Sequence, residues 1–163
     1  LHWMTVPLII LSLVMGTFVL AEMPNNLEKI NSLQVHMIIG FVVGLLTLIR
    51  IFVKKNHQPL EPLKVENNAR KKLIKFIHFA LYTLILLMVA SGITLSILSG
   101  LGEIVFFGSS APLPEDFSIY LPRKAHGIFA KVLFAFIGIH IVGVLLYKFK
   151  TDSSISKRMW FGK

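Results

Sequence analysis

The stretch that decides the fold is 126–147, HGIFAKVLFAFIGIHIVGVLLY, an apolar run in which Lys131 is the single Lys, Arg, Asp or Glu. A helix needs about 20 apolar residues to cross the hydrocarbon core of a bilayer, so this run is long enough to do so. Three similar runs precede it, at 1–21, 35–53 and 76–97. The sequence therefore predicts an all-α membrane protein with four transmembrane helices.

Composition and periodicity support helices in a membrane. Hydrophobic residues make up 55% of the chain and charged residues 15%, well below the roughly 25% charged residues of soluble domains. The runs do not alternate as the strands of a membrane barrel would, and a helix satisfies its backbone polar groups internally. We expect an up-and-down bundle in one domain, 1–163, with helices at about 1–21, 33–54, 72–99 and 124–148.

The net charge of +9 follows from how the basic residues are distributed. Most of the 17 Lys and Arg border the connection 54–75 or follow the last helix. By the positive-inside rule, this connection and both the N- and C-termini are predicted to be cytoplasmic. No basic stripe with interleaved aromatic residues occurs outside the apolar runs, so we expect no nucleic-acid partner. The chain starts at Leu1 without an initiator Met, and we expect a few residues to precede it.

Five of the six histidines lie inside or at the edge of the predicted helices: His2, His36, His78, His126 and His140. Ionisable side chains at membrane depth are costly, and they usually face the bundle interior and mark function. For a single histidine, a buried imidazole bonded to a backbone carbonyl is the commoner explanation. Five together point instead to a cofactor held between helices.

The spacing of His126 and His140 predicts two separate sites. Fourteen residues of helix end about 40° short of four full turns, so both imidazoles face one side. They stand roughly 21 Å apart along the axis, whereas the ligands of one metal ion meet within about 2 Å of it. These two histidines therefore cannot share one metal.

Depth in the membrane suggests the partner of each histidine. His36 lies near the outer end of its helix, as His126 does, so the pair can ligate one iron in the outer half of the bundle. His2 and His78 both lie near the depth of His140 at the inner end. The residues alone leave the inner partner open.

The same spacing of 14 residues recurs on the other three helices, between His2 and Gly16, between His36 and Arg50, and between His78 and Gly92. At the outer depth, Gly16 and Gly92 lack a side chain and would let a flat macrocycle lie against the backbone. At the inner depth, Arg50 can pair with a haem propionate, and snorkelling to lipid headgroups is the alternative for it.

Other positions allow a functional and an ordinary interpretation. Gly40 and Gly44 form a G-x-x-x-G pattern that serves either helix packing or contact with a haem. Arg123 and Lys124 could attract an anion to the outer site or anchor the helix end. Lys131 and His57 are interpreted as a snorkelling side chain and a solvated loop residue, respectively.

Four segments together resemble the bacterial cytochrome b561 family: HW at 2–3, VHMIIGFVVGLLTLIRI at 35–51, FIHFALYTLILLMVASG at 76–92, and KAHGIFAKVLFAFIGIH at 124–140. This is the four-helix di-haem type that includes superoxide oxidase and is related to the cytochrome b subunits of hydrogenases. The similarity covers essentially the whole chain, and its histidine spacings are more specific than its apolar residues.

The resemblance implies two haem b groups with His2 and His140 as axial ligands of the inner iron and His36 and His126 as those of the outer iron. It makes His78 an alternative ligand or a residue on the quinone side. The chain has no cysteine, which excludes disulfides, cysteine-bound iron–sulfur clusters and the covalent attachment of c-type haem.

The resemblance also implies an electron-transfer protein of the bacterial inner membrane and respiratory chain. Electrons would pass from a periplasmic-side donor, superoxide or a redox protein, to ubiquinone or menaquinone, which would make the protein a superoxide:quinone oxidoreductase. The bilayer and a second copy of the chain are further expected partners. Two alternatives are an anchor and electron-relay subunit of an oxidoreductase such as a hydrogenase, and a non-redox bundle. The apolar runs contain no Asp or Glu, which argues against a transporter.

Overall fold

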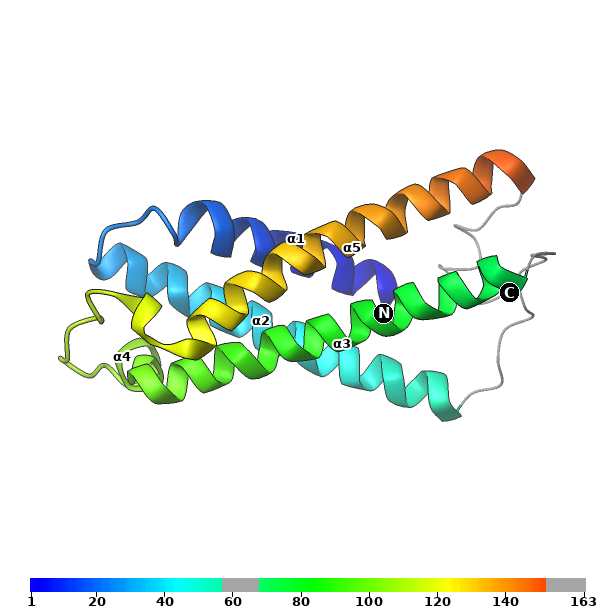
Figure 1. Ribbon diagram of the computed structural model, residues 1–163. Coiled ribbons are helices and arrows are strands. Elements are labelled where there is room, and N and C mark those ends of the chain that lie inside the picture. The colour runs from blue at the N-terminus through cyan, green and yellow to red at the C-terminus, as the bar shows by residue number, and fades with distance from the viewer. Residues whose placement is uncertain (57–67, 152–163) are drawn as a thin grey trace.

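The computed structural model describes residues 1–56 and 68–151, with side chains as far as 149. These residues form helices and turns without strands. The long helices lie side by side along one axis (Figure 1), and they are α1 (His2–Val14) with its π-helical continuation η1 (Met15–Val19), α2 (Leu27–Asn56), α3 (Asn68–Ser99) and α5 (Leu121–Thr151). The predicted all-α class is confirmed.

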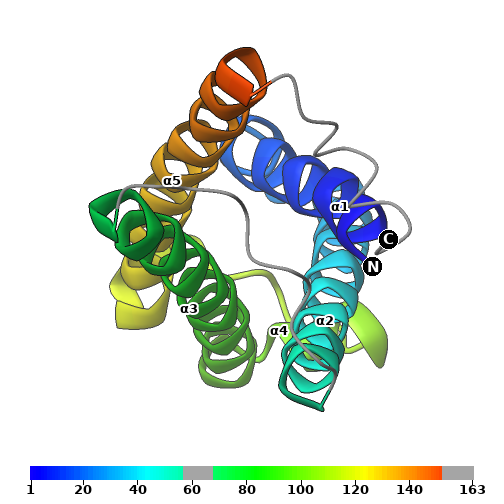
Figure 2. The same ribbon diagram turned by 90° about the vertical axis from the view of Figure 1, so that its right-hand side faces the viewer.

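Successive long helices run in opposite directions, so the N-terminus of α1 and the C-terminal end of α5 lie at the same end of the bundle (Figure 1). Seen along the axis, α2 and α5 occupy opposite corners, and so do α1 and α3 (Figure 2). The closest packing is between α3 and α5, between α1 and α2, and between α2 and α3. Side chains from α2 and α5 can therefore meet only across the bundle interior.

The long helices start earlier than the apolar runs suggest. The structure begins α2 at Leu27 and α3 at Asn68, where the sequence predicted starts at about 33 and 72. At α2 the reason is a cap, because the backbone N–H of Lys29 donates to Oδ1 of Asn26 at 3.0 Å. Such a bond satisfies one of the free amides of the first turn and extends the helix into polar sequence.

Much of the apolar surface of the long helices points outward. Four helices are long and apolar enough to span a membrane, and only 6% to 17% of the residues in their apolar windows are buried inside the protein. Phe79 is 69% exposed and Ile97 is 74% exposed. In water a surface of this kind would be strongly unfavourable, whereas hydrocarbon lipid tails solvate it.

A central apolar layer takes one buried residue from each long helix. It consists of Leu13, Val43, Ile85 and Leu133. Leu133 lies halfway along α5 between His126 and His140. The layer therefore separates two groups of histidines. We call His36 and His126 the outer pair, and His2, His78 and His140 the inner group.

The two glycines of the G-x-x-x-G pattern, Gly40 and Gly44, have different surroundings. A β-carbon at Gly44 would lie 3.1 Å from both methyl carbons of Val89, so α2 and α3 approach closely at this point. Thr47, one turn further along, is 2% exposed and donates its hydroxyl to the Val43 carbonyl. A β-carbon at Gly40 would meet nothing within 4 Å, so Gly44 serves helix packing and Gly40 does not.

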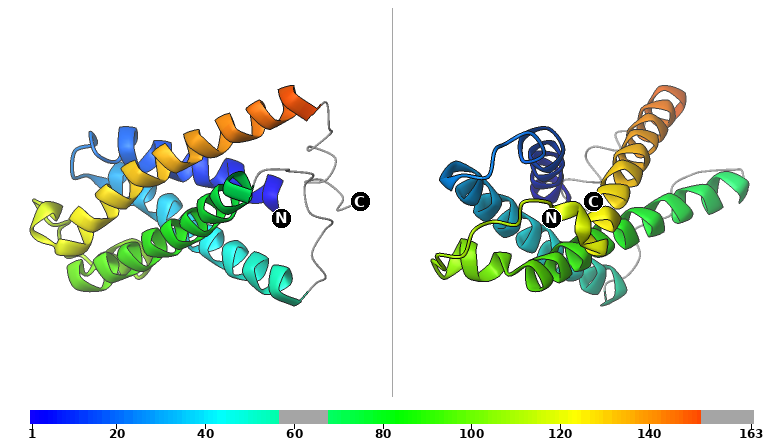
Figure 3. Two further views of the ribbon diagram at one scale, coloured as in Figure 1. Left: turned by 45° about the vertical axis from the view of Figure 1, so that its right-hand side comes forward. Right: turned by 60° about the vertical axis from the view of Figure 1, so that its left-hand side comes forward.

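A cap covers the end of the bundle opposite the N-terminus (Figure 3). It contains the short helices α4 (Leu101–Phe106) and η2 (Phe117–Ile119). Gly100 turns the chain from α3 into α4 with a φ of 69°, a conformation that glycine adopts without steric cost. Apolar side chains of the cap pack on the first turns of α2, and these are Leu101, Ile104, Val105, Leu113 and Phe117 against Ile30, Leu33 and Met37.

Candidate functional site

The outer pair of histidines meets across the interior of the bundle. The ring centroids of His36 on α2 and His126 on α5 are 6.3 Å apart, and the ring planes are inclined by 70°. Two imidazoles that share an iron, each about 2 Å from it through one nitrogen, need ring centres roughly 6 Å apart. The observed separation suits a bis-histidine iron.

The number of ligands also suits a porphyrin. Within the described parts of the chain, no group of three or more His, Cys, Asp or Glu side chains could hold a metal ion. A porphyrin supplies four nitrogens of its own and leaves two axial positions for the protein. Two facing imidazoles are therefore the set that a haem requires, whereas a protein-bound zinc ion requires more.

A cavity of about 460 Å³ lies beside these histidines, and residues of α2 and α3 form much of its wall. Its volume lies in the range of small-molecule sites, roughly 300–1,000 Å³. Apart from His36 and His126, the polar side chains that line it are Ser12 and Ser96. Gly40 and Gly92 also line it and add no bulk. A largely apolar cavity with two imidazoles suits a flat, hydrophobic macrocycle.

The glycines expected beside the outer macrocycle contact the histidine rings. A β-carbon at Gly16 would lie 3.0 Å from Cε1 of His36, and one at Gly92 would lie 3.4 Å from Cε1 of His126. Gly16 lies in the π-helical turn η1, where the Leu20 amide donates to the Met15 carbonyl at 2.9 Å. A π-turn changes the register of a helix and is frequent at functional sites. The glycines therefore make room for the imidazoles.

Two serines that the sequence interpretation missed hydrogen-bond the same rings. Oγ of Ser91 lies 2.9 Å from Nδ1 of His126, and Oγ of Ser12 lies 3.4 Å from Nδ1 of His36. A signal was present, because Ser91 directly precedes Gly92 and Ser12 lies one helical turn before Gly16. Serine at membrane depth commonly bonds its own helix backbone, so the sequence alone could not reveal these contacts.

The inner group differs from the outer pair. The ring centroids of His78 on α3 and His140 on α5 are 5.2 Å apart in an edge-to-face contact with an interplanar angle of 79°. Nδ1 of His78 donates to the Ile74 carbonyl of its own helix at 2.8 Å. This separation is about 1 Å shorter than a shared iron requires. His78 packs against His140, and donation from its Nδ1 to the helix backbone leaves the lone pair of the neutral imidazole on Nε2.

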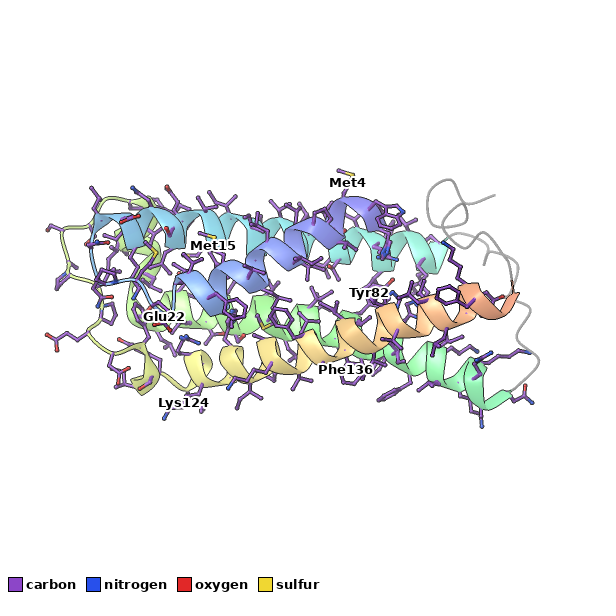
Figure 4. The ribbon with its side chains drawn as sticks, turned by 90° about the horizontal axis from the view of Figure 1, so that it is seen from above. Met4, Met15, Glu22, Tyr82, Lys124 and Phe136 are labelled. Carbon is purple, nitrogen blue, oxygen red and sulfur yellow. The ribbon has the colours of Figure 1, made fainter. Side chains whose placement is uncertain are left out.

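Arg50 reaches into the inner group. Its Nη1 lies 3.0 Å from Nδ1 of His2, and its guanidinium lies over the Tyr82 ring at 5.7 Å from the centroid. Lys54 lies over the same ring at 5.5 Å. Arg50 is half-buried, and its contact with His2 differs from the snorkelling that was the alternative. Figure 4 shows Tyr82 toward one end of the bundle and Glu22 toward the other.

The basic residues near the outer pair point in different directions. Nη1 of Arg123 lies 3.4 Å from where a β-carbon of Gly127 would be, so this half-buried side chain folds back along α5 beside His126. Lys124 and Lys131 are exposed, and Lys124 projects from the bundle in Figure 4. His57 lies outside the described residues.

Comparison with known proteins gives a family for the chain. The sequence model of one family, described as "Prokaryotic cytochrome b561", matches residues 1–162. No curated protein and no solved structure matches the chain.

Proposed function

The chain belongs to the prokaryotic cytochrome b561 family, and from this premise we propose that it passes electrons between a periplasmic-side donor and membrane quinone with two haem b groups. Membership and the apolar helices make it a multi-pass protein of the bacterial inner membrane that binds haem b and transfers electrons. The number of haems, the donor, the acceptor and the ligands are the parts that we propose.

The outer pair carries the proposal. We assign His36 and His126 as axial ligands because their ring centroids lie 6.3 Å apart beside an apolar cavity of about 460 Å³. Bound haem supplies reversible one-electron chemistry at its iron. The protein contributes two imidazole ligands, space and a setting from which water is largely excluded.

For the inner site we propose His2 and His140 as ligands. The family resemblance supports His2, and the 5.2 Å contact of His78 with His140 is too short to hold an iron between these two rings. His78 is the alternative ligand, and otherwise it lies on the quinone side. A guanidinium can only donate, so Nδ1 of His2 accepts this hydrogen bond, and Nε2 of His2 becomes free for iron only when Arg50 turns to another partner such as a propionate.

The donor and acceptor follow from the family and the charge distribution. We propose superoxide as the donor, drawn by the positive charge of Arg123 and Lys124 near His126, and ubiquinone or menaquinone as the acceptor at the inner end. The protein would then be a superoxide:quinone oxidoreductase with its N- and C-termini in the cytoplasm. A homo-oligomer is compatible with this function.

Counting haems in purified variants tests the ligand assignment. We expect two haems per wild-type chain and one in His36→Ala or His126→Ala, measured by pyridine haemochrome against protein concentration. His2→Ala should lose the inner haem, whereas His78→Ala should keep both. Loss in His78→Ala and retention in His2→Ala would reverse the inner assignment, and a colourless wild-type protein from haem-replete cells would exclude the function.

Titration with superoxide tests the donor. Superoxide should reduce the purified cytochrome, and added quinone should reoxidise it. The control is the same titration in the presence of superoxide dismutase. No reduction beyond this control would favour the relay subunit, whose electrons come from a partner enzyme.

A further inference from the structure

The ring of each outer histidine meets a serine hydroxyl on the helix beside its own. Ser12 of α1 and Gly16 of η1 contact the ring of His36 on α2. On the other side of the bundle, Ser91 and Gly92 of α3 contact the ring of His126 on α5. In both cases a hydroxyl lies beside Nδ1 and a glycine leaves open the space beside Cε1, although the two helix pairs differ in sequence.

The hydrogen bonds of Ser91 have a defined direction. Its hydroxyl donates to the Met88 carbonyl at 3.0 Å, and a hydroxyl has only one hydrogen to donate. Towards Nδ1 of His126, 2.9 Å away, Oγ can then only accept. In this arrangement Nδ1 carries the proton, and the lone pair of the neutral imidazole is on Nε2.

The surroundings of Ser91 strengthen this bond. Ser91 is 8% exposed, so little water competes for its hydroxyl, and a hydrogen bond is stronger in such a medium than in water. The Ser12 bond to His36 is longer, at 3.4 Å, beyond the usual range of about 2.7–3.2 Å for N–H···O bonds. Both hydroxyls lie on the Nδ1 side of their ring, and the contact of Ser12 is the weaker of the two.

We propose that Ser91, and to a lesser degree Ser12, are positioning residues for the outer haem, which hold Nε2 free for iron and set the haem potential. The proposal rests on the proposed function of His36 and His126 as ligands. A hydroxyl that accepts the Nδ1 proton makes the imidazole a stronger donor. A stronger donor stabilises ferric over ferrous iron and lowers the reduction potential.

Removal of each hydroxyl tests the proposal in the full-length holoprotein. Ser91→Ala should raise the midpoint potential of the outer haem, change its ferric EPR signal, and lower its affinity by about tenfold or more. Ser12→Ala should move the potential in the same direction but less. The inner haem should be unchanged in both variants.

A matched control separates the histidine contact from the loss of a helix hydroxyl. Ser99 also lies on α3 and donates to its own helix, at the Leu95 carbonyl, with a distance of 2.7 Å. Ser99→Ala should leave both potentials at wild-type values. Ser91→Thr retains the hydroxyl and should restore the wild-type potential and EPR signal.

The outcomes distinguish this inference from the proposed function. If His126→Ala keeps both haems, the ligand assignment fails and the inference fails with it. If His126→Ala loses one haem while Ser91→Ala leaves the outer potential and EPR signal unchanged, only the inference is overturned. Should Ser91→Ala bind no outer haem, a wild-type potential in Ser91→Thr supports the role of the hydroxyl, and loss of haem in both variants overturns it.

Discussion

Gly16 and His36 face each other across the interface of the first two long helices, where a β-carbon on the glycine would stand 3.0 Å from Cε1 of the imidazole. That distance is tighter than nine in ten real β-carbon contacts, so a side chain at this position requires the ring to shift by a few tenths of an ångström. Gly92 has the same relationship to His126, with a longer distance of 3.4 Å. The absence of a side chain at each glycine thus gives the outer imidazole its space, and the space is tighter at Gly16 than at Gly92.

Substitution of Gly16 should therefore impair the outer haem more than substitution of Gly92. We expect Gly16→Ala to weaken outer haem binding, because the methyl group shifts the His36 ring, and Gly92→Ala to weaken it less. The haem-to-protein ratio of the purified variants measures the difference.

Gly138→Ala is the control for these glycine variants, since a β-carbon at Gly138 would meet nothing within 4 Å. Alanine is favoured over glycine in helices by about 1 kcal/mol, so the control should bind both haems and be at least as stable as wild type. Equal haem contents in Gly16→Ala and Gly138→Ala would contradict the role of Gly16.

Loss of the Arg50 guanidinium should affect the inner haem alone. A hydrogen bond to a charged group contributes about 1.5–3 kcal/mol, so Arg50→Gln should weaken inner haem binding roughly ten- to hundredfold. Lys54→Gln is the matched control, because Lys54 shares the contact with Tyr82 and should leave binding unchanged. Haem titration of the apoprotein gives both affinities, and wild-type binding in Arg50→Gln would leave snorkelling as the role of this residue.

The approach of α2 to α3 should depend on the size of residues 44 and 89. A β-carbon at Gly44 would lie 3.1 Å from the Val89 methyl groups, and overpacking of this kind costs about 1–3 kcal/mol. Gly44→Ala should lower the free energy of unfolding in detergent, and adding Val89→Ala should recover part of the loss. Gly143→Ala, with open space around its β-carbon, is the control. Strictly additive effects of the two substitutions would exclude direct contact.

The orientation in the membrane can be measured by labelling single introduced cysteines. The chain contains no cysteine of its own that would react with the label. Both Lys71 and Ser109 are exposed; Lys71 lies in the first turn of α3, and Ser109 lies after α4 in the cap at the other end of the bundle. In intact cells with a permeable outer membrane, a membrane-impermeant maleimide should label Ser109→Cys, and it should label Lys71→Cys only after the inner membrane is opened. The reverse pattern would place the N- and C-termini in the periplasm.

Some features of the site were predictable because they lie along a single helix. The apolar runs are long enough to identify the four spans, and helical geometry puts His126 and His140 on one face at two depths whatever surrounds them. The same regularity marked Gly16, Arg50 and Gly92 as positions on the histidine faces. Family membership could likewise be inferred from four short segments, and the family match over residues 1–162 confirms it.

What the sequence determined by itself is therefore the class, the spans and the depth of each histidine, since these depend on hydropathy and on a fixed rise and rotation per residue. Only the tertiary structure decided that His36 and His126 face each other at 6.3 Å, that His78 packs against His140, and that Arg50 meets His2. It also revealed Ser12 and Ser91, which look like ordinary helix residues in the sequence. The physical reason is that depth along an axis does not specify which helices stand at opposite corners of a bundle, and contacts between helices depend on that arrangement.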